Sequence, residues 1–262
     1  MSSDSPPYQE ALAGVKEALA RPLRVVNLAQ SENVPPTRLI LAIGGKAALH
    51  SYPRKSAIVY CLVPNVMLRP DQYSGPLVRV SLSPAPAVML RNLKEIQPTL
   101  KRLGILWTSD AYVGYTAQLK AESPNFGVEV IAERLKTPEN LLDGIRAIKD
   151  RVDALWLPPD PFLITAHNFA AFKQFSLSNH IPLYVPMDNL ADQGAVAAVS
   201  SSFHNMGQKA GEVAEKILSG NPVTESSVYV EKVTLTINAS FAAQSGLELP
   251  PAVLKKADRV IP

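Results

Sequence analysis

An aspartate, Asp160, follows a short apolar run that ends in two prolines. The run, residues 154–157, is long enough for a strand buried on both faces, and helical patterns at 139–149 and 165–179 flank it. A buried strand between two helices is typical of a mostly parallel sheet, whose ligands bind just past the carboxyl ends of the strands. Asp160 is therefore a candidate acceptor for an ammonium or hydroxyl group of a ligand. The alternative interpretation is a helix cap or an ordinary loop acid.

Two adjacent glycines, Gly44 and Gly45, separate an expected strand at 39–43 from an expected short helix at 46–50. Backbone amides at a helix start could bind a ligand carboxylate or another polar group. A tight turn explains the pair equally well. A phosphate-binding loop of the P-loop type is excluded, because Ile40 lies where its upstream glycine belongs and Ala47 replaces its metal-binding hydroxyl.

The sequence contains little that points to catalysis. It has no Gly-x-Ser-x-Gly motif, and its 4 histidines, at positions 50, 167, 180 and 204, lack the spacing of metal ligands. Cys61 is the single cysteine, which excludes an intrachain disulfide, and no histidine partner is suggested beside it. We expect no enzymatic activity, no metal and no cofactor.

The composition predicts a folded α/β protein with a sizeable core. Hydrophobic residues make up 47% of the 262 residues and charged residues 19%, which argues against disorder. The net charge of +3 comes from scattered lysines and arginines, so we expect no nucleic-acid partner. No apolar run is long enough to span a membrane.

Strands and helices alternate in two runs, 1–82 and 83–198, and the alternation restarts at Ser83-Pro84. Strands are expected at 23–27, 39–43, 57–63, 77–82, 102–107, 128–133, 154–157, 182–185, 195–199 and 233–237. The first helix begins at Ser5-Pro6-Pro7, and the last long helix covers 203–219. Two doubly wound parallel-sheet lobes of this kind are the architecture of hinge-closing binding proteins.

The boundaries of the two lobes follow from these runs. We predict a first lobe of residues 1–82 with about 200–227, and a second lobe of residues 83–199 with about 228–262. Crossings between them are expected near 80–83, 199–203 and 224–233.

The end of the chain, LTINASFAAQSGLELPPAVLKKADRVI at 235–261, resembles the closing signature of a family of ABC-importer substrate-binding proteins. That family includes binding proteins for tryptophan and tyrosine. The residues that carry the resemblance are Asn238, Gly246-Leu247, Pro250-Pro251, and Ala257-Asp258 to Ile261. Segments near the start of the chain, at 43–48 and at 195–207 are also similar to the family, so the resemblance covers nearly the whole chain. It implies the type I periplasmic-binding-protein fold.

The resemblance also implies which residues face the ligand in a cleft between the lobes. They are Ser3, Asp4, Tyr8, Gly44, Gly45, Pro64, Asn65, Ser109, Asp110, Asp160, Asp188 and Phe203. Capping for Asp4, Ser109 and Asp110, and packing for Tyr8, are alternative interpretations. Amide donors in the first lobe facing acids in the second would suit a small zwitterion, such as an amino acid.

Three short segments depart from the family pattern where the ligand should lie. Residues 158–161 read Pro-Pro-Asp-Pro instead of Pro-Thr-Asp-Asn, Gly45 replaces a threonine, and Met187-Asp188 stands where an acidic pair is common. The identity of the ligand therefore does not carry over from the family.

The resemblance predicts an extracytoplasmic solute-binding protein of an ABC importer. It would capture a small polar metabolite between its lobes, close around it as a monomer, and deliver it to a permease in the membrane. A ligand-sensing module coupled to a signalling partner is the main alternative, and a cytosolic α/β enzyme is a third.

The family has a strand before its Ser-Asp loop, whereas here Met1 directly precedes Ser2-Ser3-Asp4. No positive or apolar segment of an export signal is present either. A sheet without a central strand would leave ladder groups unpaired. We therefore expect that the natural product carries an upstream strand and an export signal, and that it is periplasmic or lipid-anchored.

Overall fold

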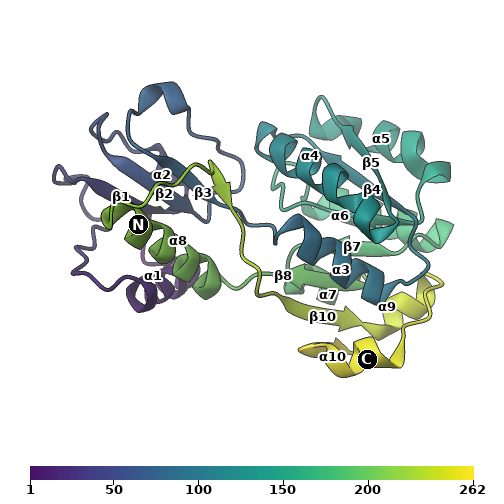
Figure 1. The fold of residues 1–262 in the computed structure, drawn as a ribbon. Coiled ribbons are helices and arrows are strands. Elements are labelled where there is room, and N and C mark those ends of the chain that lie inside the picture. Colours follow the sequence, from purple (N-terminus) through teal and green to yellow (C-terminus); the bar gives the residue numbers. More distant parts are fainter. The chain divides into compact units, whose positions relative to one another are not determined.

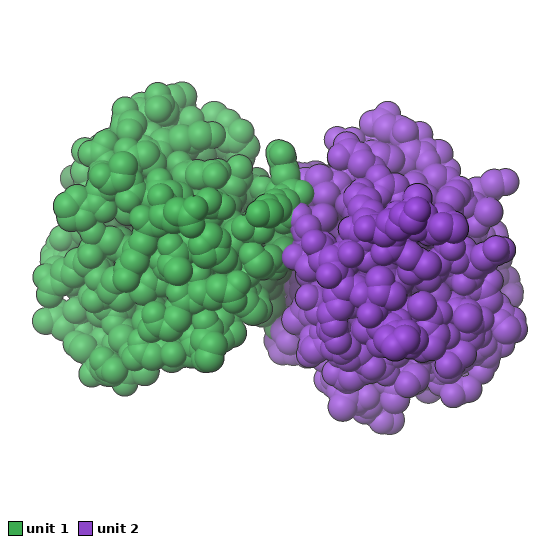
Figure 2. Space-filling model, turned by 90° about the horizontal axis from the view of Figure 1, so that it is seen from below, with its two compact units in different colours: residues 1–82, 201–232 green, residues 83–200, 233–262 purple.

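The computed structural model describes residues 1–262, which fold into two compact units (Figure 2). Unit 1 consists of residues 1–82 and 201–232, and unit 2 consists of residues 83–200 and 233–262. The chain therefore passes from one unit to the other at 82–83, 200–201 and 232–233. Each unit has its own sheet and its own core.

Unit 1 contains a four-stranded parallel sheet in the order β1-β2-β3-β9. Its strands are β1 (Leu39–Ile43), β2 (Ala57–Cys61), β3 (Leu77–Val80) and β9 (Ser227–Val228). Its helices are α1 (Pro6–Ala18), α2 (Gly45–Leu49) and α8 (Phe203–Leu218). Every residue of β2 is buried, as expected for an apolar strand with a neighbour on each side.

Helices α1 and α8 lie side by side and pack on one face of this sheet (Figure 1). Glycines permit the close approach: a β-carbon at Gly207 would lie 1.8 Å from the carbonyl oxygen of Ala11. One at Gly14 would lie 2.0 Å from the carbonyl oxygen of His204. The helix α2 and the loop after β2 cover the opposite face of the sheet.

Residues 23–27 do not form the strand that their apolar pattern predicts. The segment is irregular, and apart from the turn bonds that the Asn27 carbonyl accepts from the Gln30 and Ser31 amides, its backbone bonds only to the start of the chain. The Met1 amine donates to the Val26 carbonyl at 2.7 Å, and the Leu28 amide donates to the Met1 carbonyl at 3.0 Å. A strand needs a neighbour along its whole length, and Met1 supplies one at a single position.

Unit 2 contains a seven-stranded sheet in the order β11-β10-β8-β7-β6-β4-β5. Its strands are β4 (Arg102–Trp107), β5 (Glu129–Arg134), β6 (Ala154–Trp156), β7 (Leu183–Val185), β8 (Ala197–Ser200), β10 (Thr234–Asn238) and β11 (Arg259–Ile261). Its helices are α3 (Pro86–Ile96), α4 (Val113–Glu122), α5 (Leu141–Ile148), α6 (Ala166–Asn179), α7 (Asp188–Gly194), α9 (Ala239–Gln244) and α10 (Pro251–Lys256). The short β9, β11 and α7 were not among the elements that the sequence predicts.

One pair of strands in unit 2 is antiparallel, and the other pairs are parallel, which agrees with the mostly parallel sheet that the sequence predicts. Thr234 at the start of β10 pairs with Ser200 at the end of β8. The chain leaves unit 2 after Ser200 and re-enters it at 233, so β10 starts beside the end of β8 and must run back along it. The central strands β6 and β7 are buried throughout. None of the helices combines the length and the apolar composition needed to cross a lipid bilayer.

Candidate functional site

Most of the predicted ligand residues lie at the carboxyl ends of parallel strands, within one unit or the other. In unit 1, Gly44 and Gly45 follow β1, and Pro64 and Asn65 come shortly after β2. In unit 2, the corresponding residues after β4, β6 and β7 are Ser109, Asp110, Asp160 and Asp188. The carboxyl edge of each sheet is therefore the candidate site surface, because ligands of such sheets bind there.

Asp160 is fully buried, and protein donors occupy both oxygens of its carboxylate. Oδ2 accepts from the Thr108 amide at 2.8 Å, the Thr108 hydroxyl at 2.7 Å and the Ser109 amide at 3.2 Å. Oδ1 accepts from the Phe162 amide at 3.1 Å. These bonds compensate the carboxylate for its loss of water. Asp160 thus ties the loop after β4 to the loop after β6, and no part of it is exposed to a ligand in this structure.

Ser109 and Asp110 begin the turn that leads into α4. The Ser109 hydroxyl accepts from the Ala111 amide at 3.2 Å, which makes it a cap of this turn. Asp110 is exposed and forms an ion pair with Arg134 at 2.6 Å. Both residues lie at the carboxyl edge, and the capping predicted as an alternative is present for Ser109.

Asp188 is the first residue of α7 and is half-buried. Its Oδ1 accepts from the Ser200 hydroxyl at 2.9 Å. Because Ser200 ends β8, this bond links two neighbouring carboxyl ends of the sheet. Unlike Asp160, Asp188 keeps part of its side chain exposed to solvent.

The same edge of unit 2 carries exposed apolar side chains that the sequence analysis missed. Phe162 follows β6 and is 56% exposed, and Met187 follows β7 and is 39% exposed. Large apolar groups exposed beside polar ones are typical of binding surfaces. The sequence feature that could have pointed to Phe162 is its place, as an aromatic residue directly after Asp160-Pro161.

In unit 1, the turn after β1 is shaped by contacts with Ser2 and Tyr8. Gly44 has a φ of +90°. A β-carbon there would lie 2.7 Å from Ser2 Oγ and 2.6 Å from the Tyr8 ring. Ser2 Oγ also accepts from the Ala47 amide at 2.9 Å. The Gly44 amide donates to the Cys61 carbonyl at 2.9 Å, so only the Gly45 amide of the pair remains without a partner.

Ser3 and Asp4 differ in whether their side chains are free to bond a ligand. Ser3 is partly exposed and its hydroxyl makes no hydrogen bond. The carboxylate of Asp4 accepts from the side-chain amides of Gln9 at 2.9 Å, Gln30 at 3.2 Å and Asn27. Asp4 therefore joins α1 to the segment 27–30 in the structure.

The loop that contains Pro64 and Asn65 is held by Arg79, a buried residue of β3. The Arg79 guanidinium donates to the carbonyls of Val63 at 3.3 Å and Pro64 at 3.2 Å. Sequence reasoning missed this residue, although a single charge in the apolar run Leu77–Val80 is a usable signal. Phe203 begins α8 and packs against the core that α1 and α8 share.

Neither unit contains groups suited to metal binding or thiol chemistry. No group of three or more His, Cys, Asp or Glu side chains could hold a metal ion. Burial raises the pKa of the Cys61 thiol to about 12, so it is not a thiolate at neutral pH. The polar groups at the two edges can donate and accept hydrogen bonds, which suits binding more than catalysis.

A sequence model of the family described as ABC transporter substrate binding protein matches residues 88–261. A relative is the tyrosine-binding protein of Clostridioides difficile (strain R20291), which is 23% identical over 144 residues. The match covers 53% of this chain and 40% of the relative. The chain therefore matches less than half of the length of that protein.

Several solved structures share the fold over nearly the whole chain. The structure of an ABC domain in complex with L-Trp from Streptococcus pneumonia is 20% identical, with a TM-score of 0.62, and the match covers 99% of this chain and 98% of that one. A conserved domain protein from Vibrio cholerae is 18% identical, with a TM-score of 0.66 and coverage of 99% and 97%. The ligand-free, open structure of a substrate binding protein with adhesive properties from Clostridium difficile is 19% identical, with a TM-score of 0.61 and coverage of 99% and 97%.

Proposed function

Since the chain belongs to the family of ABC transporter substrate-binding proteins, we propose that it captures a small polar metabolite for uptake by an ABC importer. The predicted family and the type I periplasmic-binding-protein fold are both confirmed. The family binds substrates without converting them, so the protein is a binding protein and not an enzyme.

The observation that carries the proposal is the polar character of the two carboxyl edges. Unit 1 offers the Ser3 hydroxyl and the Gly45 amide, which have no partner within the protein. Unit 2 offers the half-buried carboxylate of Asp188. A ligand that contacts both units would meet donors from one and an acid from the other, as a zwitterion requires.

We propose that the ligand is an amino acid with an apolar side chain. Asp188 would pair with the ligand ammonium, because a buried charge needs an opposite charge beside it. Asp160 is not available for this role, since donors of the protein occupy both of its oxygens. Phe162 and Met187 would cover the apolar side chain. The names of two relatives, a tyrosine-binding protein and a complex with L-Trp, support this class of ligand without fixing its identity.

The proposal includes a partner and a location. A substrate-binding protein of an importer works outside the cytoplasm, in the periplasm or on a lipid anchor, and hands its ligand to an ABC permease in the membrane. Family membership supports this arrangement for a protein that would act as a monomer.

A thermal-shift screen of the twenty amino acids, simple sugars and small acids tests the proposal. A ligand that binds only the folded state raises the melting temperature by mass action. We expect an amino acid with a large apolar side chain to give the largest shift, and Asp188→Asn to reduce that shift much more than Asp110→Asn. A stabilising sugar or acid, with no response to any amino acid, would contradict the proposed ligand class.

A further inference from the structure

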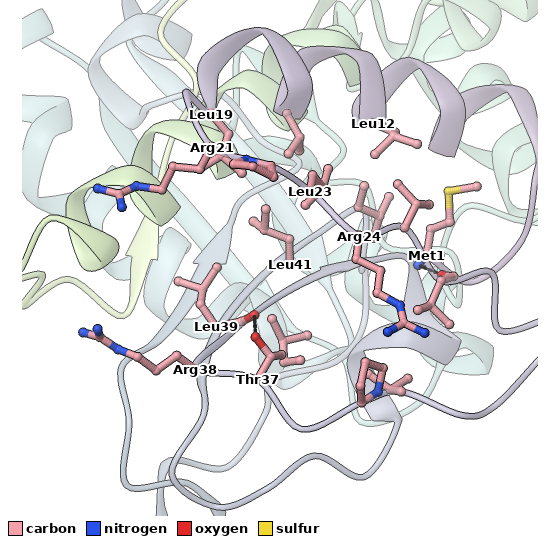
Figure 3. A pocket seen from close by; sticks show the side chains of 18 of the residues that line it. Met1, Leu12, Leu19, Arg21, Leu23, Arg24, Thr37, Arg38, Leu39 and Leu41 are labelled. Carbon is pink, nitrogen blue, oxygen red and sulfur yellow. Dashed lines mark hydrogen bonds between the residues drawn. The ribbon is translucent and has the colours of Figure 1, made fainter.

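Arg79 and Asp160 are the two charged side chains that the protein buries, and they lie in different units. The other arginines of unit 1 are exposed. Two of them, Arg21 and Arg38, lie at the rim of a groove of about 580 Å³ and extend their guanidinium groups away from the leucines that line it (Figure 3). A guanidinium inside the protein loses its water, so it needs hydrogen bonds that compensate for the loss.

Three hydrogen bonds of Arg79 reach the same loop. Its strand β3 lies beside β2, with Arg79 opposite Tyr60, and the loop 62–69 follows β2 directly. Nη2 donates to the carbonyls of Val63 at 3.3 Å and Pro64 at 3.2 Å, and Nη1 donates to the thioether sulfur of Met67 at 3.2 Å. One planar group with donors in a fixed fork thus holds the loop at several points.

The loop starts with a residue in a strained conformation. Leu62 has a φ of +57°, in the left-handed region that residues with a large side chain rarely adopt. Such a conformation persists only where the surrounding contacts compensate for it. Directly after Leu62, the carbonyls of Val63 and Pro64 meet the Arg79 guanidinium. Arg79 therefore supplies compensating contacts at the place where the strain occurs.

The positions that Arg79 anchors lie on both sides of Asn65. Pro64 precedes it, and Met67 follows it after one further residue. The loop belongs to the carboxyl edge of unit 1, and Asn65 is half-buried there. A side-chain amide both donates and accepts hydrogen bonds, so it suits the polar groups of a small ligand. The shape of the loop decides where this amide lies.

We propose that Arg79 is a positioning residue for ligand binding. Its guanidinium keeps the loop 62–69 in one conformation and so holds Asn65 in place at the carboxyl edge before a ligand arrives. The Arg79 side chain is only 5% exposed, so it acts through the loop and not by contact with the ligand. The inference rests on the proposed function, because it concerns the same binding surface.

The effect on binding follows from preorganisation. A loop that is ordered in advance loses no further conformational entropy when the ligand binds. Without the guanidinium, the binding-competent loop is only a fraction of the population, and the apparent Kd rises by the inverse of that fraction. Lysine keeps the charge but lacks the fork of donors. Arg79→Lys should therefore retain only part of the affinity.

The first test measures the loop without any ligand. Arg79→Met keeps a long unbranched side chain but removes the guanidinium. We expect the NMR order parameters of the amides at 65–67 to fall from about 0.85 to below about 0.6. Arg54→Met is the matched control, because the exposed Arg54 also donates to a carbonyl, that of Asp71 at 3.3 Å. In the control, the order parameters at 65–67 should stay at the values of the parent protein.

The second test measures affinity by calorimetry, with L-phenylalanine and L-tryptophan as probes. We expect Arg79→Met to weaken binding about tenfold or more, and Arg79→Lys to lose less. In an Asn65→Ala protein, the same change at Arg79 should weaken binding less than about twofold, because the loop no longer carries the side chain that Arg79 positions. An arginine with only a structural role would act equally in both backgrounds.

Unchanged order parameters in Arg79→Met would overturn the proposal, and so would equal losses of affinity with and without Asn65. If Arg79→Met does not fold, Arg79→Lys takes its place, and a parent-like loop with parent-like affinity in that variant would equally overturn the proposal. If neither amino acid binds the parent protein, the proposed ligand class fails. The order parameters, which need no ligand, then decide the role of Arg79 by themselves.

Discussion

The carboxylate of Asp160 accepts two hydrogen bonds from Thr108, one from its amide at 2.8 Å and one from its hydroxyl at 2.7 Å. The two residues lie 52 positions apart, at the ends of neighbouring strands. The buried acid therefore fixes the loop that carries Ser109 to the loop that carries Phe162. Its position past β6 is one where ligands of such sheets bind, but both oxygens of its carboxylate are occupied by donors of the protein itself.

Replacement of Asp160 by asparagine should destabilise unit 2 in the absence of any ligand. The Asp160→Asn side chain keeps its shape but turns an NH₂ group toward donors, so buried groups lose their acceptor at a cost of about 1–3 kcal/mol. Chemical denaturation of the unliganded protein measures this cost, with the exposed Asp110→Asn as the control. Unchanged stability together with a large loss of ligand affinity would instead favour direct contact between Asp160 and the ligand.

The two adjacent glycines should respond differently to alanine. At Gly44, a φ of +90° and the contacts with Ser2 and Tyr8 leave no room for a β-carbon. Gly44→Ala should lower the free energy of unfolding on the order of 1–3 kcal/mol. At Gly45 no atom lies within 4 Å of an added β-carbon, so Gly45→Ala is the matched control and should be tolerated. Similar melting temperatures for both variants would contradict the geometry of this turn.

Apolar runs were sufficient to predict most strands of the two sheets. A parallel strand that is buried on both faces consists almost entirely of apolar residues, so the sequence shows it directly. β2 and β6 are examples, and the residues after them lie at the carboxyl edges as predicted. The strand predicted at 23–27 is absent, because a strand forms only beside a neighbouring strand. The apolar pattern of a segment does not show whether such a neighbour exists. β11 was missed because it has only 3 residues, two of them exposed.

The roles of single residues were harder to predict than their places. Asp160 lies past β6 as expected. Its partner Thr108 is distant in sequence, so only the three-dimensional structure shows that protein donors already occupy the Asp160 carboxylate. Arg79 and Phe162 were missed for a related reason. A charge inside a strand and an aromatic residue in a loop both run against the general pattern, and such exceptions are expected where a protein binds.

Cys61 should be unreactive until the protein unfolds. Its pKa is raised to about 12 by burial, so the folded protein holds a neutral thiol. The stability that this neutral thiol contributes is complete below the unfolded pKa of about 8.5 and is lost as the pH rises toward 12. A thiol reagent at pH 8 should label the protein only in denaturant, and Cys61→Ala should remove the signal. Rapid labelling of the native protein would show that the β2 core opens readily.

Ligand binding should reduce the radius of gyration if the protein closes as hinged binding proteins do. The chain passes between the units three times, at 82–83, 200–201 and 232–233, and a ligand that contacts both units would favour a closed state. Small-angle scattering with and without the ligand from the thermal screen measures this change. Asp188→Asn at the same ligand concentration is the control and should stay at the unliganded value. An unchanged radius at saturation would count against closure.

Phe162 should contribute to affinity without contributing to stability. Its side chain is 56% exposed, so Phe162→Ala should leave the melting temperature of the unliganded protein nearly unchanged. If the ring covers an apolar ligand side chain, its loss removes about 1.5–3 kcal/mol of apolar burial, which corresponds to roughly tenfold to a hundredfold weaker binding. Leu142 on α5 is a control of similar exposure, because it is 55% exposed but follows the edge strand β5, which does not neighbour β6. Calorimetry on the two alanine variants distinguishes them, and a Phe162→Ala protein that binds within about threefold of the parent would remove the ring from the site.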